Sequence, residues 1–504
     1  MRYSRNVLTL MREHRSFFLG TILAGLALRL LFFIYFPVIT DDSHVYADLA
    51  NNWLHHGVYG LIAANPPAGQ QETTAKLATR IVPVDTRLPG YPAFLAGIFW
   101  LFGSDNFKAA MLVQILLDLG TCLIVADLAR RMVSAGAARI ALMLTALCPF
   151  LANYAAAALT ETLEIFFTAL ALDFAAAALN RMYGADEGLK PAERTPQRNL
   201  NPTTIKLWAA TGAAIAACIL LRPDGGVLLA AIGLYMGVVM WKRRASRKNV
   251  ADILVAGIVV AAVSLAPLAP WTIRNFRTLH HFQPLAPRYA TESNELVPLG
   301  FIRWVKTWIA DYASVEEIYW NVPGDKIDPE KLPSRAFDNP AEKEATLALI
   351  ADYNQSQEMT APLDARFGVI AAERIRAHPI RYYAALPLLR TVDMWLRPRT
   401  AILPPDVRWW EFNDDPKESV LAVSFGLLNL AYIGAALMGL IRKRAGIRWI
   451  GLLVCFLLLR SALLVTLENP EPRYTLECYP AVIVLAAACL ATANGKQRPV
   501  RAGF

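Results

Sequence analysis

The stretch SFFLGTILAGLALRLLFFIYFPVITDDSHVY, residues 16–46, decides which class of fold the chain can adopt. Its first part, 16–38, is almost entirely apolar, and a helix needs about 20 such residues to cross the roughly 30 Å hydrocarbon core of a bilayer. The segment contains Arg29 and lacks a small-residue cleavage site, so it predicts a retained membrane anchor rather than a signal peptide. Two adjacent acids, Asp41 and Asp42, follow this anchor directly and are therefore expected at a membrane boundary.

The rest of the chain repeats the apolar pattern. Hydrophobic residues make up 55% of the 504 residues and charged residues only 18%, a composition that excludes an ordinary soluble enzyme. We therefore expect an all-α integral membrane protein with about ten transmembrane helices. The apolar windows are 16–38, 108–129, 139–158, 162–180, 204–221, 226–241, 251–271, 418–441, 447–467 and 478–493.

The distribution of basic residues orients these helices. The net charge is +9, and membrane proteins collect Lys and Arg in cytoplasmic loops, so no nucleic-acid partner is needed to explain the charge. Alternating spans place every basic cluster and both termini on the cytoplasmic side. Two segments, 91–103 and 381–396, are predicted to lie in the membrane interface, because the first is short and the second contains Arg and Asp. The basic clusters lie within 2–15, 130–139, 181–206, 242–248, 442–448 and 496–501.

Two long segments, 39–107 and 272–417, are expected to be extracytoplasmic. The second of them separates the two sets of spans, so the chain is predicted to have three parts. We predict an N-terminal transmembrane catalytic module (1–271) that includes the first of these loops. A small mixed cap region (272–417) with the interfacial helix near 381–396 follows, and then C-terminal helices with a cytoplasmic tail (418–504). Long loops in compact proteins usually carry function, so both segments are candidate parts of a site.

No metal or other cofactor is predicted. The six cysteines fall within or at the ends of the apolar windows, where they resemble small apolar residues more than a disulfide framework or a metal site. His44, His55 and His56 are too loosely spaced for a convincing metal site, and a solvated helix face explains them better.

Polar residues recur where the predicted spans reach the outer surface. Because these helix ends are remote in sequence but face the same side, we expect them to converge on one site. The residues are Asp41 and Asp42 after the first span, Glu161 after the third, Arg222 and Asp224 after the fifth, Arg274 after the seventh, and Arg473 with Tyr474 after the ninth.

Each of these residues also has a simpler interpretation. Asp42 could cap a helix over 43–57 that Gly57 would end. The boundary arginines could meet lipid headgroups. Arg29 and Arg460 fall inside the predicted membrane, where each could pair with Asp118 or Asp173.

Several motifs resemble the bacterial polyprenyl-phosphate-sugar-dependent glycosyltransferases, relatives of the protein O-mannosyltransferases and the aminoarabinose transferases. The resemblance rests on the order and spacing of the motifs, and it implies the C-type glycosyltransferase fold. The motifs are DSHVYADLANNWLHHGVY (42–59), TRLPGYPAFLAGIFWLFG (86–103), LCPFLANYAAAALTETL (147–163), LLRPDGGVLLA (220–230), PWTIRNF (270–276) and PRYTLECYPAVIVL (472–485).

The resemblance also implies roles for individual residues. In such enzymes the catalytic Asp of the first extracytoplasmic loop precedes a Tyr by four residues, a relation that falls here on Asp42 and Tyr46. Many relatives have Glu directly after this Asp, where this chain has Ser43. Residues 281–417 contain none of the motifs that carry this resemblance, and acceptor choice is expected there. The candidate substrate-binding residues are Asp41, Tyr46, Arg87, Tyr91, Glu161, Arg222, Asp224, Arg274, Asn275, Arg473 and Tyr474.

The implied reaction is transfer of a sugar from a polyprenyl phosphate to an acceptor hydroxyl, by inversion, with Asp42 as the base. Arg222, Arg274 and Arg473 would hold the lipid phosphate, for which the planar guanidinium is well suited. The implied partners are the lipid-linked donor, a protein, lipid or glycan acceptor, and membrane lipid.

The implied location is the bacterial inner membrane, as a multi-pass protein with an extracytoplasmic active site. Two alternatives stay open: a transporter or flippase for lipid-linked sugars, and an O-antigen ligase or polymerase. A transporter would favour repeated halves with broken helices, which the sequence does not show.

Overall fold

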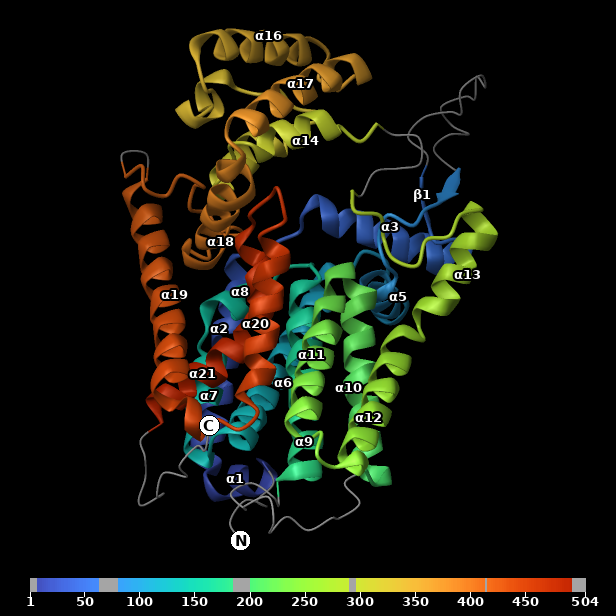
Figure 1. Ribbon diagram of the computed structural model, residues 1–504, viewed down its shortest axis with the longest axis vertical. Helices are drawn as coiled ribbons and strands as arrows, with labels where there is room; N and C mark the ends of the chain where they lie inside the picture. The colour runs from blue at the N-terminus through green and yellow to red at the C-terminus, as the bar shows by residue number, and fades with distance from the viewer. Residues whose placement is uncertain (1–6, 63–79, 185–199, 290–295, 413–414, 492–504) are drawn as a thin grey trace. The chain divides into compact units, whose positions relative to one another are not determined.

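The computed structural model describes the chain except residues 1–6, 63–79, 185–199, 290–295, 413–414 and 492–504 (Figure 1). The basic residues at 496–501, Arg2, Arg5 and most of the 181–206 cluster lie outside the described residues. Contacts divide the chain into two compact units. The first unit comprises 1–290, 432–459 and 477–504, and the second comprises 291–431 and 460–476.

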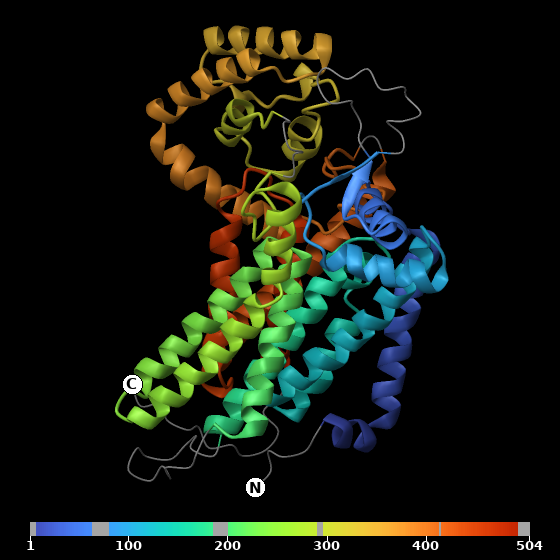
Figure 2. The same ribbon diagram turned by 90° about the vertical axis from the view of Figure 1, so that its right-hand side faces the viewer.

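The first unit is a bundle of apolar helices. In Figures 1 and 2 its long helices run side by side, with α3 and α5 across one end and α1 at the other. Its helices are α1 (Val7–Glu13), α2 (Arg15–Tyr35), α3 (Asp41–His56), α5 (Gly90–Phe102), α6 (Phe107–Met132), α7 (Ala135–Ala146), α8 (Pro149–Ala155), α9 (Glu161–Tyr183), α10 (Pro202–Leu221), α11 (Gly226–Lys242), α12 (Arg247–Leu265), α13 (Leu268–Leu279) and α21 (Tyr479–Leu490). A short antiparallel hairpin pairs β1 (Gly60–Ile62) with β2 (Ile81–Pro83).

Small residues let these helices approach closely. Helix α9 packs against α6 and α10, and α10 packs in turn against α12. A Cβ at Gly212 of α10 would lie 2.9 Å from the carbonyl oxygen of Val260 in α12. A Cβ at Gly90 would lie 2.5 Å from the carbonyl oxygen of Leu220, so the start of α5 sits directly against the end of α10. Such contacts are typical of helix packing in membranes, and they bring α5 beside the turn that carries Arg222.

The second unit is built from shorter helices around its own apolar core. The core gathers Phe301, Trp304, Trp308, Tyr353 and Phe367, all buried. Its helices are α14 (Leu299–Lys306), α15 (Tyr312–Ser314), α16 (Pro340–Ser356), α17 (Ala361–Ala377) and α18 (Leu386–Leu396), with single turns at Val315–Tyr319, Pro329–Lys331, Ser334–Ala336 and Arg381–Ala385. Three elements have residues in both units: α19 (Pro416–Lys443), α20 (Ile450–Leu464) and the turn Pro472–Cys478.

The predicted membrane character is confirmed. In the described part of the chain, eight helices are long and apolar enough to cross a bilayer, or nine if the bent pair α7–α8 forms one span. Each predicted window overlaps a helix among the described residues, although the 139–158 window is divided between α7 and α8 and α20 is only 15 residues long. The protein is therefore a multi-pass, all-α membrane protein.

Two local predictions have clear outcomes. Of the two partners predicted for Arg29, Asp118 is the one that pairs with it, at 2.5 Å. The other, Asp173, pairs with Arg131 at 2.8 Å. The capping role considered for Asp42 is wrong, because α3 begins at Asp41 and its N-cap is Thr40. Gly57 does end this helix, in the left-handed conformation with φ of 67°.

Candidate active site

The start of α3 presents Asp42 without using it as a cap. The Ser43 amide donates to Thr40 Oγ1 at 3.4 Å, and the Thr40 amide donates to Ser43 Oγ at 3.0 Å, which completes a capping box. Ser43 thus takes the place that Glu often holds in this motif. Asp42 lies in the first helical turn, where the helix dipole stabilises a negative charge. Its side chain is 34% exposed, while the neighbouring Asp41 is also exposed.

Arg87 holds the Asp42 carboxylate. Its Nη2 lies 2.9 Å from Asp42 Oδ1, and its own side chain is 24% exposed. Burial lowers the pKa of Arg87, but Tyr46 and Asp42 outweigh that effect, so the pKa lies above its ordinary value. The pair joins the start of α3 to the segment between β2 and α5. Both the carboxylate and the guanidinium stay within reach of solvent.

Tyr46 lies beneath this pair, one turn along α3. It is buried, and burial together with the Asp42 charge raises its pKa to about 12, although Arg87 and Arg222 oppose the shift. Its ring packs edge-on against Tyr91 of α5, with centroids 5.1 Å apart. The Tyr91 hydroxyl donates to Gln114 of α6 at 2.8 Å. A chain of polar aromatic contacts therefore fixes α3 and α5 against α6.

Arg222 forms a second and more buried charged centre. It caps α10 and donates to Asp224 at 3.2 Å and to Glu161 Oε1 at 3.4 Å. Glu164 and Glu477 also interact with it electrostatically. Glu161 is only 2% exposed, so a buried ion pair ties the end of α10 to the start of α9, while Glu477 acts on Arg222 from the turn Pro472–Cys478.

Arg274 and Asn275 hold loops together. Arg274 of α13 donates to the carbonyl oxygens of Val84, at 2.7 Å, and Tyr59. Its guanidinium also lies over the rings of Tyr59 and Trp271, at 5.4 and 5.3 Å. Asn275 is fully buried and donates to the Gln283 carbonyl at 2.8 Å. These contacts join α13 to both sides of the β1–β2 hairpin.

Arg473 and Tyr474 belong to the second unit, where they form a cluster with Glu471. Arg473 Nε lies 2.5 Å from Glu471 Oε2, and the Tyr474 hydroxyl donates to the same carboxylate. Asn469 donates to the Tyr474 hydroxyl at 3.0 Å.

Within the first unit the structure therefore assembles most of the predicted residues around two centres. The first holds Asp42, Tyr46, Arg87 and Tyr91, and the second holds Glu161, Arg222 and Asp224.

Sequence reasoning missed three polar residues of these centres. Gln114, Glu164 and Glu477 all contact or face the predicted site residues. Gln114 and Glu164 lie inside apolar windows, where a polar side chain is costly and therefore marks a functional or structural network. That rule could have identified them. The described residues contain no group of three or more His, Cys, Asp or Glu side chains placed to hold a metal ion.

Comparisons with known proteins agree with this architecture. Residues 85–184 match the family model described as dolichyl-phosphate-mannose-protein mannosyltransferase, a segment that includes Arg87, Tyr91 and Glu161. No curated protein matches the chain.

Among solved structures, the chain is similar to the archaeal oligosaccharyltransferase AglB from Archaeoglobus fulgidus in complex with an inhibitory peptide and a dolichol-phosphate. The identity is 15% and the TM-score 0.51, over 95% of this chain and 50% of AglB. The chain thus spans half the length of that enzyme. It is also similar to ArnT from Cupriavidus metallidurans bound to undecaprenyl phosphate, at 14% identity and a TM-score of 0.33, over 94% of this chain and 77% of ArnT. The resemblance seen in the sequence is supported at the level of the fold: the chain shares the fold of AglB, and its residues 85–184 match the model of the dolichyl-phosphate-mannose-protein mannosyltransferase family.

Proposed function

We propose that the protein is a membrane glycosyltransferase that moves a sugar from a polyprenyl-phosphate donor to an acceptor hydroxyl, with Asp42 as the base. The observation that carries this proposal is the half-exposed Asp42–Arg87 pair. Arg87 lies within the family-matched segment, and Asp42 lies on the helix that this segment supports. AglB was solved with a dolichol-phosphate, and we transfer that donor class to this chain.

The reaction needs little covalent chemistry from the protein. The acceptor oxygen attacks the anomeric carbon while the bond from that carbon to the phosphate oxygen breaks, and the lipid phosphate leaves with the electron pair. Because an alcohol is a far weaker acid than a carboxylic acid, its proton passes to Asp42 as the new bond forms rather than before. Attack from the face opposite the leaving group inverts the anomeric configuration.

The surrounding residues position this carboxylate. Arg87 fixes its orientation, and Tyr46 supports Arg87 from within the bundle. Holding reacting groups in the right geometry can supply a large part of a rate enhancement.

The lipid phosphate would be bound by arginines, and we propose unequal shares for the three predicted ones. Arg274 already donates to two backbone carbonyls, and Arg222 is already surrounded by carboxylates. Both guanidinium groups are therefore already engaged, and each is expected to contribute less to phosphate binding than its charge alone would suggest. Lysine at these positions would keep the charge but lose the planar fork.

We further propose that the enzyme resides in a bacterial inner membrane with its active site on the extracytoplasmic face, acting on a protein, lipid or glycan acceptor. Basic residues at 242–248 support a cytoplasmic position for the α11–α12 turn. Single cysteines at Ala245 and Glu358, both exposed, test this in intact cells. An impermeant maleimide should label E358C but not A245C. Labelling of A245C alone would overturn the orientation.

The function is tested directly with the purified full-length protein in proteoliposomes. Mannosyl phosphoryl polyprenol is the donor, and a membrane extract of the deletion strain supplies the acceptors. The expected result is protein-dependent transfer of labelled sugar to extract components. Movement of the intact donor across the bilayer without transfer would indicate a flippase. Transfer from pyrophosphate-linked donors alone would indicate a ligase or polymerase.

A further inference from the structure

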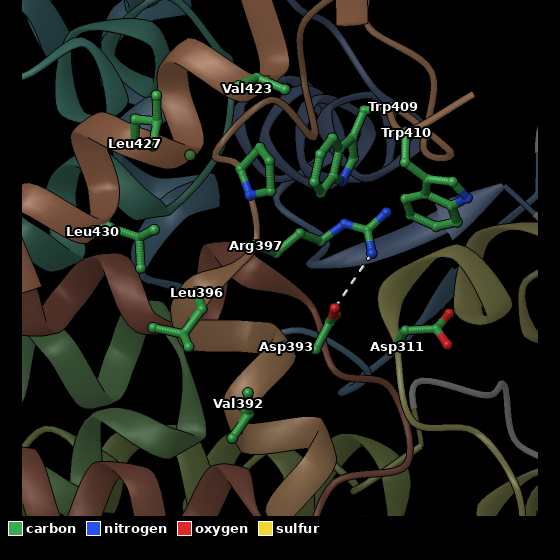
Figure 3. A pocket seen from close by; sticks show the side chains of 12 residues that line it. Asp311, Val392, Asp393, Leu396, Arg397, Trp409, Trp410, Val423, Leu427 and Leu430 are labelled. Atoms are coloured by element: carbon green, nitrogen blue, oxygen red, sulfur yellow. Dashed lines mark hydrogen bonds and ion pairs between the residues drawn. The ribbon is translucent and has the colours of Figure 1, made fainter. Parts of the chain in front are cut away.

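A cavity of about 410 Å³ lies inside the second unit, distinct from the Asp42 site (Figure 3). One wall is formed by Val392 and Leu396 of α18, and another by Val423, Leu427 and Leu430 of α19. The cavity is therefore lined mainly by apolar side chains from two helices.

These apolar side chains are unusually exposed. Val392 is 52% exposed, Leu396 40%, Leu427 64% and Leu430 45%. Helix α19 is long and apolar enough to span a bilayer. Exposed leucines on such a helix are suited to hydrocarbon rather than water, so a lipid chain is the natural occupant of the cavity.

The polar end of the cavity is held rigidly but carries little net charge. Arg397 donates to Asp393 Oδ1 at 3.4 Å and to the Val407 carbonyl, and its guanidinium lies 5.6 Å from the Trp410 ring. The other Asp393 oxygen accepts from the Tyr312 amide at 2.9 Å. Because Asp393 balances Arg397, the cavity offers no surplus of positive charge for a phosphate monoester.

One hydrogen-bond donor at this end has no acceptor. Trp409 Nε1 is fully buried and makes no hydrogen bond within the described part of the chain. Trp409 lines the cavity beside Arg397, as Figure 3 shows. A buried donor left unsatisfied costs about 1–3 kcal/mol, so a ligand oxygen placed there would be favoured.

A second, more polar cavity of about 240 Å³ shares Arg397, Pro398 and Trp409 with the first. Its other lining residues include Glu316 and Asp406, both exposed carboxylates. The shared wall thus separates an apolar space from an acidic one. This arrangement matches an amphipathic ligand whose headgroup carries a positive charge.

We propose that the second unit binds a glycerophospholipid with an ammonium headgroup, of the phosphatidylethanolamine type. One acyl chain occupies the apolar cavity, an ester oxygen accepts from Trp409 Nε1, and the ammonium group faces Glu316 and Asp406. This site goes beyond the proposed transfer reaction and does not depend on it.

Native mass spectrometry of the delipidated full-length protein tests the proposal, with phosphatidylethanolamine and phosphatidylglycerol titrated separately. Wild-type protein should prefer phosphatidylethanolamine. Leu427→Trp fills the apolar cavity from an exposed position and should weaken binding at least tenfold. Trp409→Phe keeps the ring but removes the donor, and should weaken binding about fivefold.

Leu437→Trp is the matched control, since Leu437 is 53% exposed on the same helix but does not line the cavity. It should bind as the wild type does. Undiminished binding in L427W and W409F would overturn the site. Equal affinity for phosphatidylglycerol, or a preference for polyprenyl phosphate, would overturn the assignment of the ligand. The Asp42→Asn variant should keep full lipid binding, which separates this test from that of the transfer reaction.

Discussion

The two charged centres of the first unit use the same kinds of residue in opposite ways. At the first centre, one carboxylate pairs with one guanidinium, and the side chains of Asp42 and Arg87 are 34% and 24% exposed. At the second, Arg222 is 18% exposed, its partner Glu161 is 2% exposed, and Asp224, Glu164 and Glu477 also act on the same guanidinium. A carboxylate that must receive a proton from a substrate has to be reachable, and Asp42 is the most exposed carboxylate of the two centres, at 34% against 21% for Asp224.

The difference shows that a charged residue at a helix end can either face solvent, where it could react, or join helices, where it stabilises the fold. Asp42 points from the first turn of a helix whose capping bonds are made by Thr40 and Ser43. Arg222 closes the end of α10, joins it to α9 through Glu161, and interacts electrostatically with Glu477 in the turn Pro472–Cys478. We therefore assign chemistry to the exposed pair and stability to the buried group, and this assignment can be broken by mutation.

The largest effect on stability is expected from Arg222→Met. Removing the guanidinium leaves buried carboxylates without their counter-ion, which typically costs about 3–5 kcal/mol in the free energy of unfolding. Denaturant unfolding of the purified protein measures it. Arg244→Met, at an exposed position, is the control and should change stability by less than about 0.5 kcal/mol. Similar small changes in the free energy of unfolding for both variants would show that the Arg222 centre does not stabilise the fold.

Arg87→Lys should show the reverse pattern. The charge stays but the planar fork that orients Asp42 is lost, so kcat should fall about tenfold or more while KM changes little. The unfolding free energy should change by less than about 1 kcal/mol, because the pair is partly exposed. Steady-state transfer kinetics and unfolding are measured on the same preparation. If Arg87→Lys loses stability but keeps kcat, Arg87 stabilises the fold and does not position Asp42.

Thr40→Ala separates capping from catalysis. Loss of the cap hydroxyl should lower the unfolding free energy by about 1 kcal/mol. Asp42→Asn should leave stability within about 0.5 kcal/mol, because Asp42 is not the cap. Chemical denaturation of both variants gives the comparison. A larger loss of unfolding free energy in Asp42→Asn than in Thr40→Ala would indicate that Asp42 caps the helix after all.

The smallest effect concerns an exposed ion pair in the second unit. Asp338 accepts two hydrogen bonds from Arg381, at 2.7 and 2.8 Å, and these bonds together with the nearby Arg374 lower its pKa. A lowered folded-state pKa stabilises the protein above the unfolded value of about 3.9, and this stabilisation is lost as the pH falls through the folded pKa. Stability measured between pH 6 and pH 3 should fall less steeply in Asp338→Asn than in the wild type. Identical pH profiles would show that the pair contributes nothing.

Much of this organisation could be read from the sequence. Lengths of apolar windows locate the spanning helices because the bilayer fixes the length that a helix needs. Arg29 and Arg460, both inside windows, were each expected to pair with Asp118 or Asp173; Arg29 does pair with Asp118, whereas Arg460 donates to the Tyr474 carbonyl oxygen. Asp42 was expected at the start of a helix that contains Tyr46, and the structure places both residues near Arg87.

Other features depend on contacts between distant segments. The capping box at Thr40 was hidden because Ser43 replaces the usual Glu or Gln. Averaged hydropathy conceals single polar residues such as Glu164 inside apolar windows. The binding of Arg274 to the carbonyls of Tyr59 and Val84 could not be predicted, because backbone carbonyls carry no sequence signature. Sequence reasoning therefore identified residues that the fold brings together, but it could not divide them between reaction and support.

Single-turnover sugar transfer by Asp42→Asn, compared with Asp41→Asn, tests the central claim most directly. Both variants remove one carboxylate from the first turn of α3, but Asp42 forms an ion pair with Arg87 at 2.9 Å, whereas Asp41 is exposed. General-base catalysis is typically worth about 10²–10⁴-fold, so Asp42→Asn should lose at least about a hundredfold in rate while Asp41→Asn keeps most of its activity. Retention of more than about a tenth of the wild-type rate by Asp42→Asn, in protein of unchanged stability, would contradict the assignment of Asp42 as the base.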